Sequence, residues 1–145
     1  MEAKMNQLNN VILEGTLVNE PEVVARSAVT NSRLVKFTIA NDRYYKDVNG
    51  NPKQETLFLV VQCWGELGEK ALTSIHKGMI VRAVGRLMMC RWETKTGEKK
   101  STIEIVCSHI EYRVNRNNRE SKLEILEDEK KEADVLCEST VLYEF

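Results

Sequence analysis

The chain has 145 residues, of which 42% are hydrophobic and 30% charged, with a formal net charge of −1. This length and composition predict one globular domain, and the absence of an apolar run near the roughly 20 residues of a membrane helix argues against a membrane protein. The N-terminal residues lack the apolar core of a secretory signal, so a cytoplasmic location is expected.

The small net charge conceals an uneven distribution. Residues 120–145 hold nine acids and three bases, and the preceding residues hold 18 bases and 13 acids. A basic body with an acidic end favours an anionic partner for the body. A solvated surface followed by a solubilising tail is the alternative interpretation.

Strand patterns and turn signals alternate along most of the chain. Strands are predicted, in chain order, over residues 10–18, 33–40, 56–64, 79–93 and 101–107. Gly15 and Gly85 indicate bends within two of them, and residues 19–32 show turn residues without a clear period. One short helix is predicted over residues 65–77, with Gly78 as its stop signal.

These elements indicate an all-β fold. Five strands with a helix between the third and fourth are typical of a small Greek-key barrel of the OB type. We therefore expect a five-stranded OB-fold barrel over residues 5–114. Residues 115–145 are expected to form an acidic, flexible C-terminal tail, because only a narrow apolar stripe interrupts their charges.

The strand at 56–64 has large apolar residues on both faces. Its odd row, Leu57 to Cys63, is apolar throughout and is expected to face the core. Its even row includes Phe58 and Trp64, two aromatics that the core does not require. Exposed aromatic rings stack on unpaired bases, with about 1–3 kcal/mol for each base. The alternative is that these rings pack under the helix or against another subunit.

Basic residues accompany the aromatics, as a surface that follows a phosphate backbone requires. Candidates for phosphate contacts near the aromatics are Arg43, Lys46, Arg82, Arg86, Arg91 and Lys95. His76 and His109 lack partners at metal-binding or catalytic spacing, and no nucleophile–base set is present. The sequence therefore predicts a binding protein rather than an enzyme, without cofactor or metal.

Several segments together resemble the bacterial single-stranded DNA-binding protein (SSB) family. In chain order they read NNVILEGTLVNEPEV, LVKFTIAND, TLFLVVQCWGELGEKA, HKGMIVRAVGRL and RWETKTGEKKSTIEIV. The resemblance runs nearly continuously from about Asn10 to Tyr112. The resemblance implies an OB-fold homotetramer that binds single-stranded DNA in replication, recombination and repair. It places base-stacking residues at Tyr45, Phe58, Trp64 and Trp92, and bases at Lys46, Lys77 and Arg91.

The chain also departs from the family pattern. Glu66, Met88 and Cys90 stand where bases are common, which implies fewer phosphate contacts and a shallower salt dependence. Leu59 replaces a histidine associated with subunit contacts, so a dimer is an alternative to the tetramer. The tail ends VLYEF, without the family's run of Asp and its Pro. Glu144 and Phe145 are the residues by which this tip is expected to dock replication and repair proteins.

Two other functions fit the same patterns. An OB-fold adaptor of the primosome type would bury the aromatics in a protein interface. A single-stranded RNA-binding protein would use the same stacking, which does not test for the 2′-hydroxyl.

Overall fold

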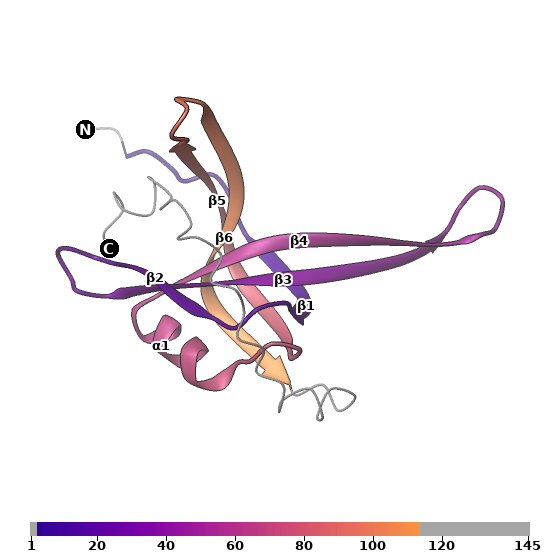
Figure 1. Cartoon of the computed structure of the whole chain (residues 1–145), viewed down its shortest axis with the longest axis horizontal. Helices are drawn as coiled ribbons and strands as arrows, with labels where there is room; N and C mark the ends of the chain where they lie inside the picture. Colours follow the sequence, from indigo (N-terminus) through magenta and orange to yellow (C-terminus); the bar gives the residue numbers. More distant parts are fainter. Residues whose placement is uncertain (1–2, 114–145) are drawn as a thin grey trace.

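Six strands and one helix make up residues 3–113, the part of the chain that the computed structural model describes (Figure 1). The elements are β1 (Val11–Leu17), β2 (Glu22–Arg26), β3 (Arg33–Lys46), β4 (Pro52–Trp64), α1 (Gly65–Ser74), β5 (Ile80–Glu93) and β6 (Lys99–Arg113). The expected acidic tail, including Glu144 and Phe145, lies outside the described residues. Within residues 3–113, no helix is long and apolar enough to cross a membrane.

The strands close into a barrel. Their order in the sheet is β1-β5-β6-β4-β3-β2, and a further pairing of β1 with β3, at Thr16–Ala40 and Leu17–Ile39, closes the sheet and leaves β2 outside the closed ring. Strands β1, β3, β4, β5 and β6 thus form a five-stranded barrel, and α1 lies between the third and the fourth of them. The predicted OB-fold barrel with its single helix is confirmed.

The core follows the predicted alternation where the strands belong to the barrel. Phe37 and Ile39 on β3 and Val61 and Cys63 on β4 are buried, and they pack with Ile75 at the end of α1. Burial of such side chains stabilises the fold by about 1.5–3 kcal/mol each. The helix itself ends at Ser74, earlier than predicted, and Gly78 lies in the following turn with φ of 91°.

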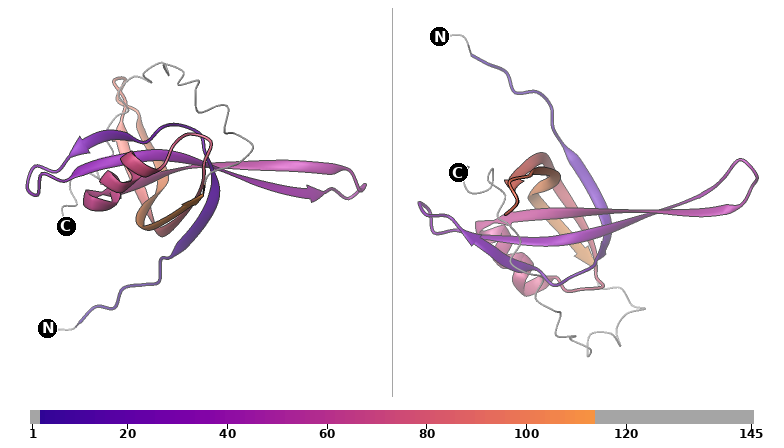
Figure 2. Two further views of the ribbon diagram at one scale, coloured as in Figure 1. Left: turned by 90° about the horizontal axis from the view of Figure 1, so that it is seen from below. Right: turned by 45° about the horizontal axis from the view of Figure 1, so that its top comes forward.

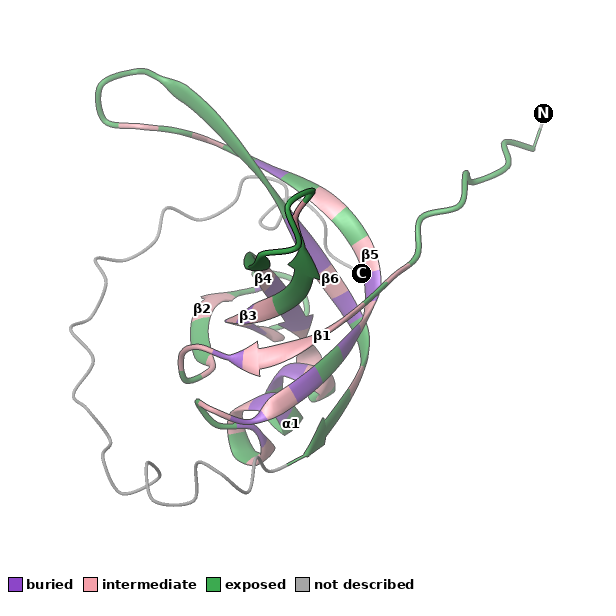
Figure 3. Cartoon of the chain, turned by 90° about the vertical axis from the view of Figure 1, so that its right-hand side faces the viewer, coloured by how far each residue is buried: buried purple, intermediate pink, exposed green. Residues whose placement is uncertain are grey.

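Two hairpins continue beyond the barrel as arms. The pairing of β1 with β5 ends at Gly85, and β6 pairs with β4 only at Ile105 and Val106. We call residues 41–57 the β3–β4 arm and residues 87–103 the β5–β6 arm. Both project from the barrel in Figures 1 and 2, and the β3–β4 arm is almost entirely exposed in Figure 3.

The arms explain where the predicted core is wrong. Leu57 was expected to face the core by alternation, but it is exposed, as are the apolar residues Leu87 and Met89 on β5. The alternation of apolar and polar residues continues into the arms, where no opposing layer of the barrel covers the apolar face of the strands. Gln62 shows the reverse, because it lies on the outer face of β4 and is nevertheless 0% exposed.

Strand β2 was not expected from the sequence. It pairs with β3 from Glu22–Lys36 to Arg26–Arg33, with a register shift between Val23 and Ala25. A bulge of this kind puts adjacent residues out of alternation, so the run of apolar residues Val23 to Ala25 shows no period of two. The bend predicted at Gly85 is confirmed by a register shift between Val84 and Gly85.

Candidate nucleic-acid interface

The outer face of β4 carries Phe58 and Trp64, and we call it the stacking face. The register of β3 and β4 places Ala40 directly opposite Phe58 and Leu34 opposite Trp64. Phe58 is 63% exposed, since its small neighbour leaves the ring uncovered. Trp64 is partly buried at the point where β4 passes into α1. An aromatic at each end of this row is the arrangement expected from the sequence.

A largely buried polar cluster lies between the two rings. Gln62 Nε2 donates a hydrogen bond to Glu104 Oε1 at 2.9 Å, and Lys36 Nζ forms an ion pair with the same oxygen at 3.0 Å. Gln62 Nε2 also contacts Cys90 Sγ at 3.3 Å. The cluster ties β3, β4, β5 and β6 together on the outside of the barrel. Buried charges of this kind are tolerated when each is paired and hydrogen-bonded.

The cluster also indicates which face of the barrel Trp92 lies on. Cys90 contacts Gln62 on the stacking face, and Trp92 is two residues farther along β5, so both side chains share one face of that strand. The β5–β6 arm therefore turns its Trp92 face toward the strand that bears Phe58 and Trp64. The strand faces that carry Phe58 and Trp64 on β4 and Trp92 on β5 therefore meet at the Gln62–Cys90 contact.

Both tryptophans border surface hollows that contain basic groups. The hollow at Trp64 has a volume of about 390 Å³ and includes Arg86 with the polar side chains of Asn9 and Ser108. The hollow at Trp92 has a volume of about 440 Å³ and holds three bases and one acid, Arg91, Lys99, Lys100 and Glu93. A ring beside cationic groups can hold a base by stacking and its phosphate by charge.

Lys99 and Lys100 were not among the basic residues predicted from the sequence to contact phosphate. Lys100 pairs directly with Trp92, and Lys99 with Glu93. The turn at residues 94–98 could have indicated this, because a short hairpin turn places the residues on its two sides opposite each other. Lys95, which was expected to contact phosphate, lies exposed in that turn.

The fourth predicted stacking residue, Tyr45, lies in the β3–β4 arm and is arranged differently. It pairs with Lys53, an odd number of steps from the Ala40–Phe58 pair, so its side chain leaves the opposite face of the ladder. The guanidinium of Arg43 covers the Tyr45 ring at 4.8 Å from its centroid, and Arg43 Nη1 pairs with Glu55 Oε2 at 3.2 Å. The structure thus groups Arg43 with Tyr45, apart from Phe58.

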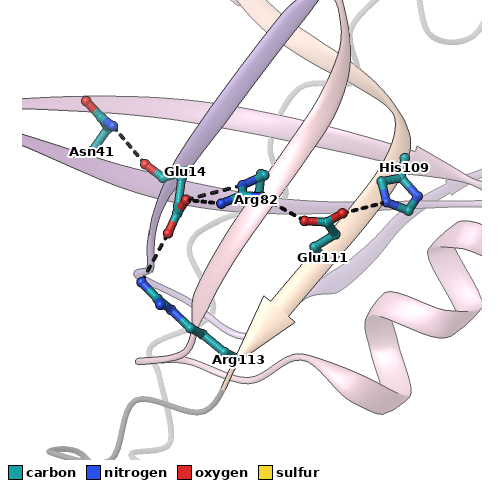
Figure 4. A network of polar contacts seen from close by, with 6 residues as sticks. All are labelled: Glu14, Asn41, Arg82, His109, Glu111 and Arg113. Atoms are coloured by element: carbon teal, nitrogen blue, oxygen red, sulfur yellow. Dashed lines mark hydrogen bonds and ion pairs between the residues drawn. The ribbon is translucent and has the colours of Figure 1, made fainter.

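Arg82 belongs to a separate ion-pair network (Figure 4). It pairs with Glu14 at 3.0 Å and with Glu111 at 2.9 Å, and Arg113 pairs with Glu14 at 3.2 Å. The hydrogen bond and the charge of Glu14 raise the pKa of Arg82 above its ordinary value. Two carboxylates therefore already balance the Arg82 charge.

The remaining predicted bases are dispersed. Lys77 is exposed in the turn after α1, where its backbone N–H donates to Glu20 Oε1 at 3.1 Å. Lys46 is exposed at the end of β3, and Arg91 is exposed on the β5–β6 arm. Within residues 3–113 the structure has no group of three His, Cys, Asp or Glu side chains that could hold a metal ion.

Residues 8–113 match the profile of a family described as the single-strand binding protein family. The chain belongs to this family. The match covers all six strands and the helix, so the single-strand binding fold accounts for every described element.

Individual relatives agree with this assignment. A protein named single-stranded DNA-binding protein from Thermotoga maritima is 34% identical over 130 residues, which cover 86% of this chain and 91% of the relative. Single-stranded DNA-binding protein 1 of Chlorobaculum tepidum is 36% identical over 105 residues, which cover 72% of this chain and 64% of that protein. A solved structure described as a Plasmodium falciparum SSB complex with single-stranded DNA superposes with a TM-score of 0.67 at 20% identity. It covers 78% of this chain and 99% of that chain, and it supports the fold alone.

Proposed function

We propose that this chain binds single-stranded DNA without sequence preference and without catalysis. Bases stack on Phe58, Trp64 and Trp92, and phosphates follow nearby basic groups. The observation that carries this proposal is the stacking face, because Phe58 and Trp64 share one face of β4 and the Gln62–Cys90 contact turns the Trp92 arm toward it. The names of the family and of its members support the same ligand.

The chemistry of the surface favours an unpaired strand over a duplex. Stacking needs the open face of a base, which a duplex does not offer, and every base has such a face. Arg86, Arg91, Lys99 and Lys100 border the two tryptophan hollows and supply charge for the backbone. Because Arg82 is paired with two carboxylates, we do not include it in the phosphate path, the set of basic residues proposed to contact the DNA backbone.

A competition experiment tests the proposal and its alternatives. A fluorescently labelled thymidine oligomer is titrated with the protein and its anisotropy recorded, with unlabelled single-stranded DNA, duplex DNA and single-stranded RNA as competitors. We expect single-stranded DNA to compete best and the duplex to compete poorly. Stronger competition by RNA would assign an RNA ligand, and no binding of any oligomer would favour the adaptor interpretation.

The salt dependence distinguishes the two arginines. Arg91→Gln is expected to reduce the slope of log affinity against log salt by about 0.7, the value for one phosphate contact on a single strand. Arg82→Gln is the matched control and is expected to leave that slope unchanged. Titrations at three salt concentrations measure both slopes, and an equal change in the two variants would contradict the proposed path.

We further propose that the chain assembles into a homo-oligomer, a tetramer as the family resemblance implies. Met89 and Ile103 pair across the β5–β6 arm and are both exposed, as is Leu87 on the same face. An exposed apolar row of this kind on a small domain is typical of an interaction surface. We propose that a second copy of the same chain covers this apolar row.

A charge placed on this row tests the assembly. The double variant Met89→Glu and Ile103→Glu is expected to lower the mass measured by light scattering toward that of a monomer, because buried unpaired carboxylates are costly. Val48→Glu, which changes a fully exposed residue at the tip of the other arm, should leave the mass unchanged. An oligomer of the original mass in the double variant would place the interface elsewhere.

The cellular role is part of the same proposal. Single strands arise in replication, recombination and repair, so we expect the protein to act in these processes, in the cytoplasm and with the nucleoid. We also propose that Glu144 and Phe145 dock partner proteins of replication and repair. These two residues lie outside the described part of the chain, and the test is loss of partner capture when both are deleted while binding of the oligomer persists.

A further inference from the structure

The β3–β4 arm has two faces, and they differ in how accessible their aromatic residues are. Strand pairing continues without interruption from Ala40–Phe58 through Asp42–Thr56 and Tyr44–Gln54 to Lys46–Pro52. Alternate pairs of an antiparallel ladder share a face, so Tyr44 and Lys46 lie on the face of Phe58. Tyr45 lies on the other face.

The ring of Tyr44 is the more accessible of the two neighbours. Tyr44 is 72% exposed, whereas Tyr45 is 40% exposed. One side of the Tyr45 ring is occupied by the Arg43 guanidinium at 4.8 Å, and Arg43 is held in turn by Glu55. A base that stacked on that side of Tyr45 would have to displace a cation–π contact and an ion pair.

The surface between Tyr44 and Phe58 is fixed by hydrogen bonds. Thr56 Oγ1 donates to Asp42 Oδ1 at 2.7 Å, and Gln54 Nε2 donates to the same oxygen at 3.3 Å. The Asp42 carboxylate is thereby engaged by its own neighbours. Tyr44 is four steps along β3 from Ala40, the residue opposite Phe58, which corresponds to about 13 Å.

We propose that Tyr44, rather than Tyr45, is the base-stacking residue of the β3–β4 arm. The bound strand then continues outward from Phe58 over Tyr44 and meets the positive charge of Lys46 at the end of β3. This inference rests on the proposed binding of single-stranded DNA. It adds a contact on the outer part of the arm, beyond the barrel.

Adjacent alanine variants provide a matched test. Tyr44→Ala and Tyr45→Ala remove the same side chain from neighbouring exposed positions, and a thermal unfolding curve for each checks that the fold is retained. The affinity for a thymidine oligomer is measured by anisotropy. We expect Tyr44→Ala to weaken binding roughly 5- to 150-fold, the range for one lost stack, and Tyr45→Ala to change it by less than about threefold.

The remaining outcomes overturn the inference. A larger loss in Tyr45→Ala, equal losses in the two variants, or no loss in Tyr44→Ala would each show that Tyr44 is not the stacking residue of the arm. Tyr44→Phe keeps the ring and should bind like the wild type, so a loss in that variant would assign the effect to the hydroxyl instead. The wild-type titration is read first, because absence of binding there refutes the proposed function itself.

Discussion

Replacement of both Phe58 and Trp92 by alanine is expected to weaken binding of single-stranded DNA by roughly 30-fold or more. Each aromatic that stacks on a base contributes about 1–3 kcal/mol, so two together contribute about 2–6 kcal/mol. The two rings lie on different hairpins, and both are at least partly exposed, so their removal leaves the barrel core intact. Anisotropy of a labelled thymidine oligomer measures the loss.

Tyr112→Ala is the control for this double variant. Tyr112 is an exposed aromatic on β6 that borders the hollow of the Glu14–Arg82 network, away from the two tryptophan hollows. Its replacement should leave the affinity within about twofold of wild type. If the double variant binds as tightly as the Tyr112→Ala control, the stacking face is not the binding surface.

Gly85→Ala is expected to cause a large loss of stability. A methyl group built on Gly85 would lie 2.0 Å from the Val106 carbonyl oxygen and 2.8 Å from the Val106 carbonyl carbon. These are backbone atoms of the neighbouring strand, so β5 and β6 must separate at the bulge. We expect a decrease of at least about 3 kcal/mol in the free energy of unfolding, at or above the upper end for overpacking.

Denaturant unfolding monitored by circular dichroism measures this decrease. Gly50→Asn serves as a comparison, because Gly50 has φ of 79° in the tip of the other hairpin and nothing lies within 4 Å of a methyl group there. Asparagine tolerates that backbone region, so a change below about 1 kcal/mol is expected. A Gly85→Ala protein as stable as wild type would show that the strands do not approach this closely.

The barrel could be predicted because its signals are local. The apolar alternation of Phe37 and Ile39 marks the inner face of β3, and the short helical segment after Trp64 identifies the OB-type order. Phe58 could be recognised as an outward-facing ring for the same reason. Each of these inferences needs only the period of a strand and the order of the elements.

The buried polar cluster could not be predicted in this way. Lys36, Gln62 and Glu104 lie on outer faces, where polar residues are ordinarily solvated. Their burial depends on the contact between the β5–β6 arm and β4. This is a tertiary contact, and the periodicity of residues along one strand does not reveal it. The exposure of Leu57 has a related cause, because alternation does not reveal where a strand leaves the barrel.

The choice between Tyr44 and Tyr45 also lies beyond the sequence pattern. Two adjacent tyrosines leave opposite faces of a strand, but which of them shares the face of Phe58 depends on the pairing register. The structure sets this register by pairing Lys46 with Pro52 across a five-residue connection. The family resemblance aligns residues one by one along the sequence. It carries no information about the pairing register of β3 and β4, because that register depends on the length of the connection between them.

The central claim is that bases stack on the aromatic face, and the intrinsic tryptophan fluorescence tests it most directly. The chain has two tryptophans, and Trp64 and Trp92 both belong to the proposed surface. The protein is titrated with an unlabelled thymidine oligomer at low salt and again at high salt. The tryptophan fluorescence should be quenched to saturation at both salt concentrations, because stacking persists when charges are screened. Fluorescence that stays constant while anisotropy shows the oligomer bound would contradict the account.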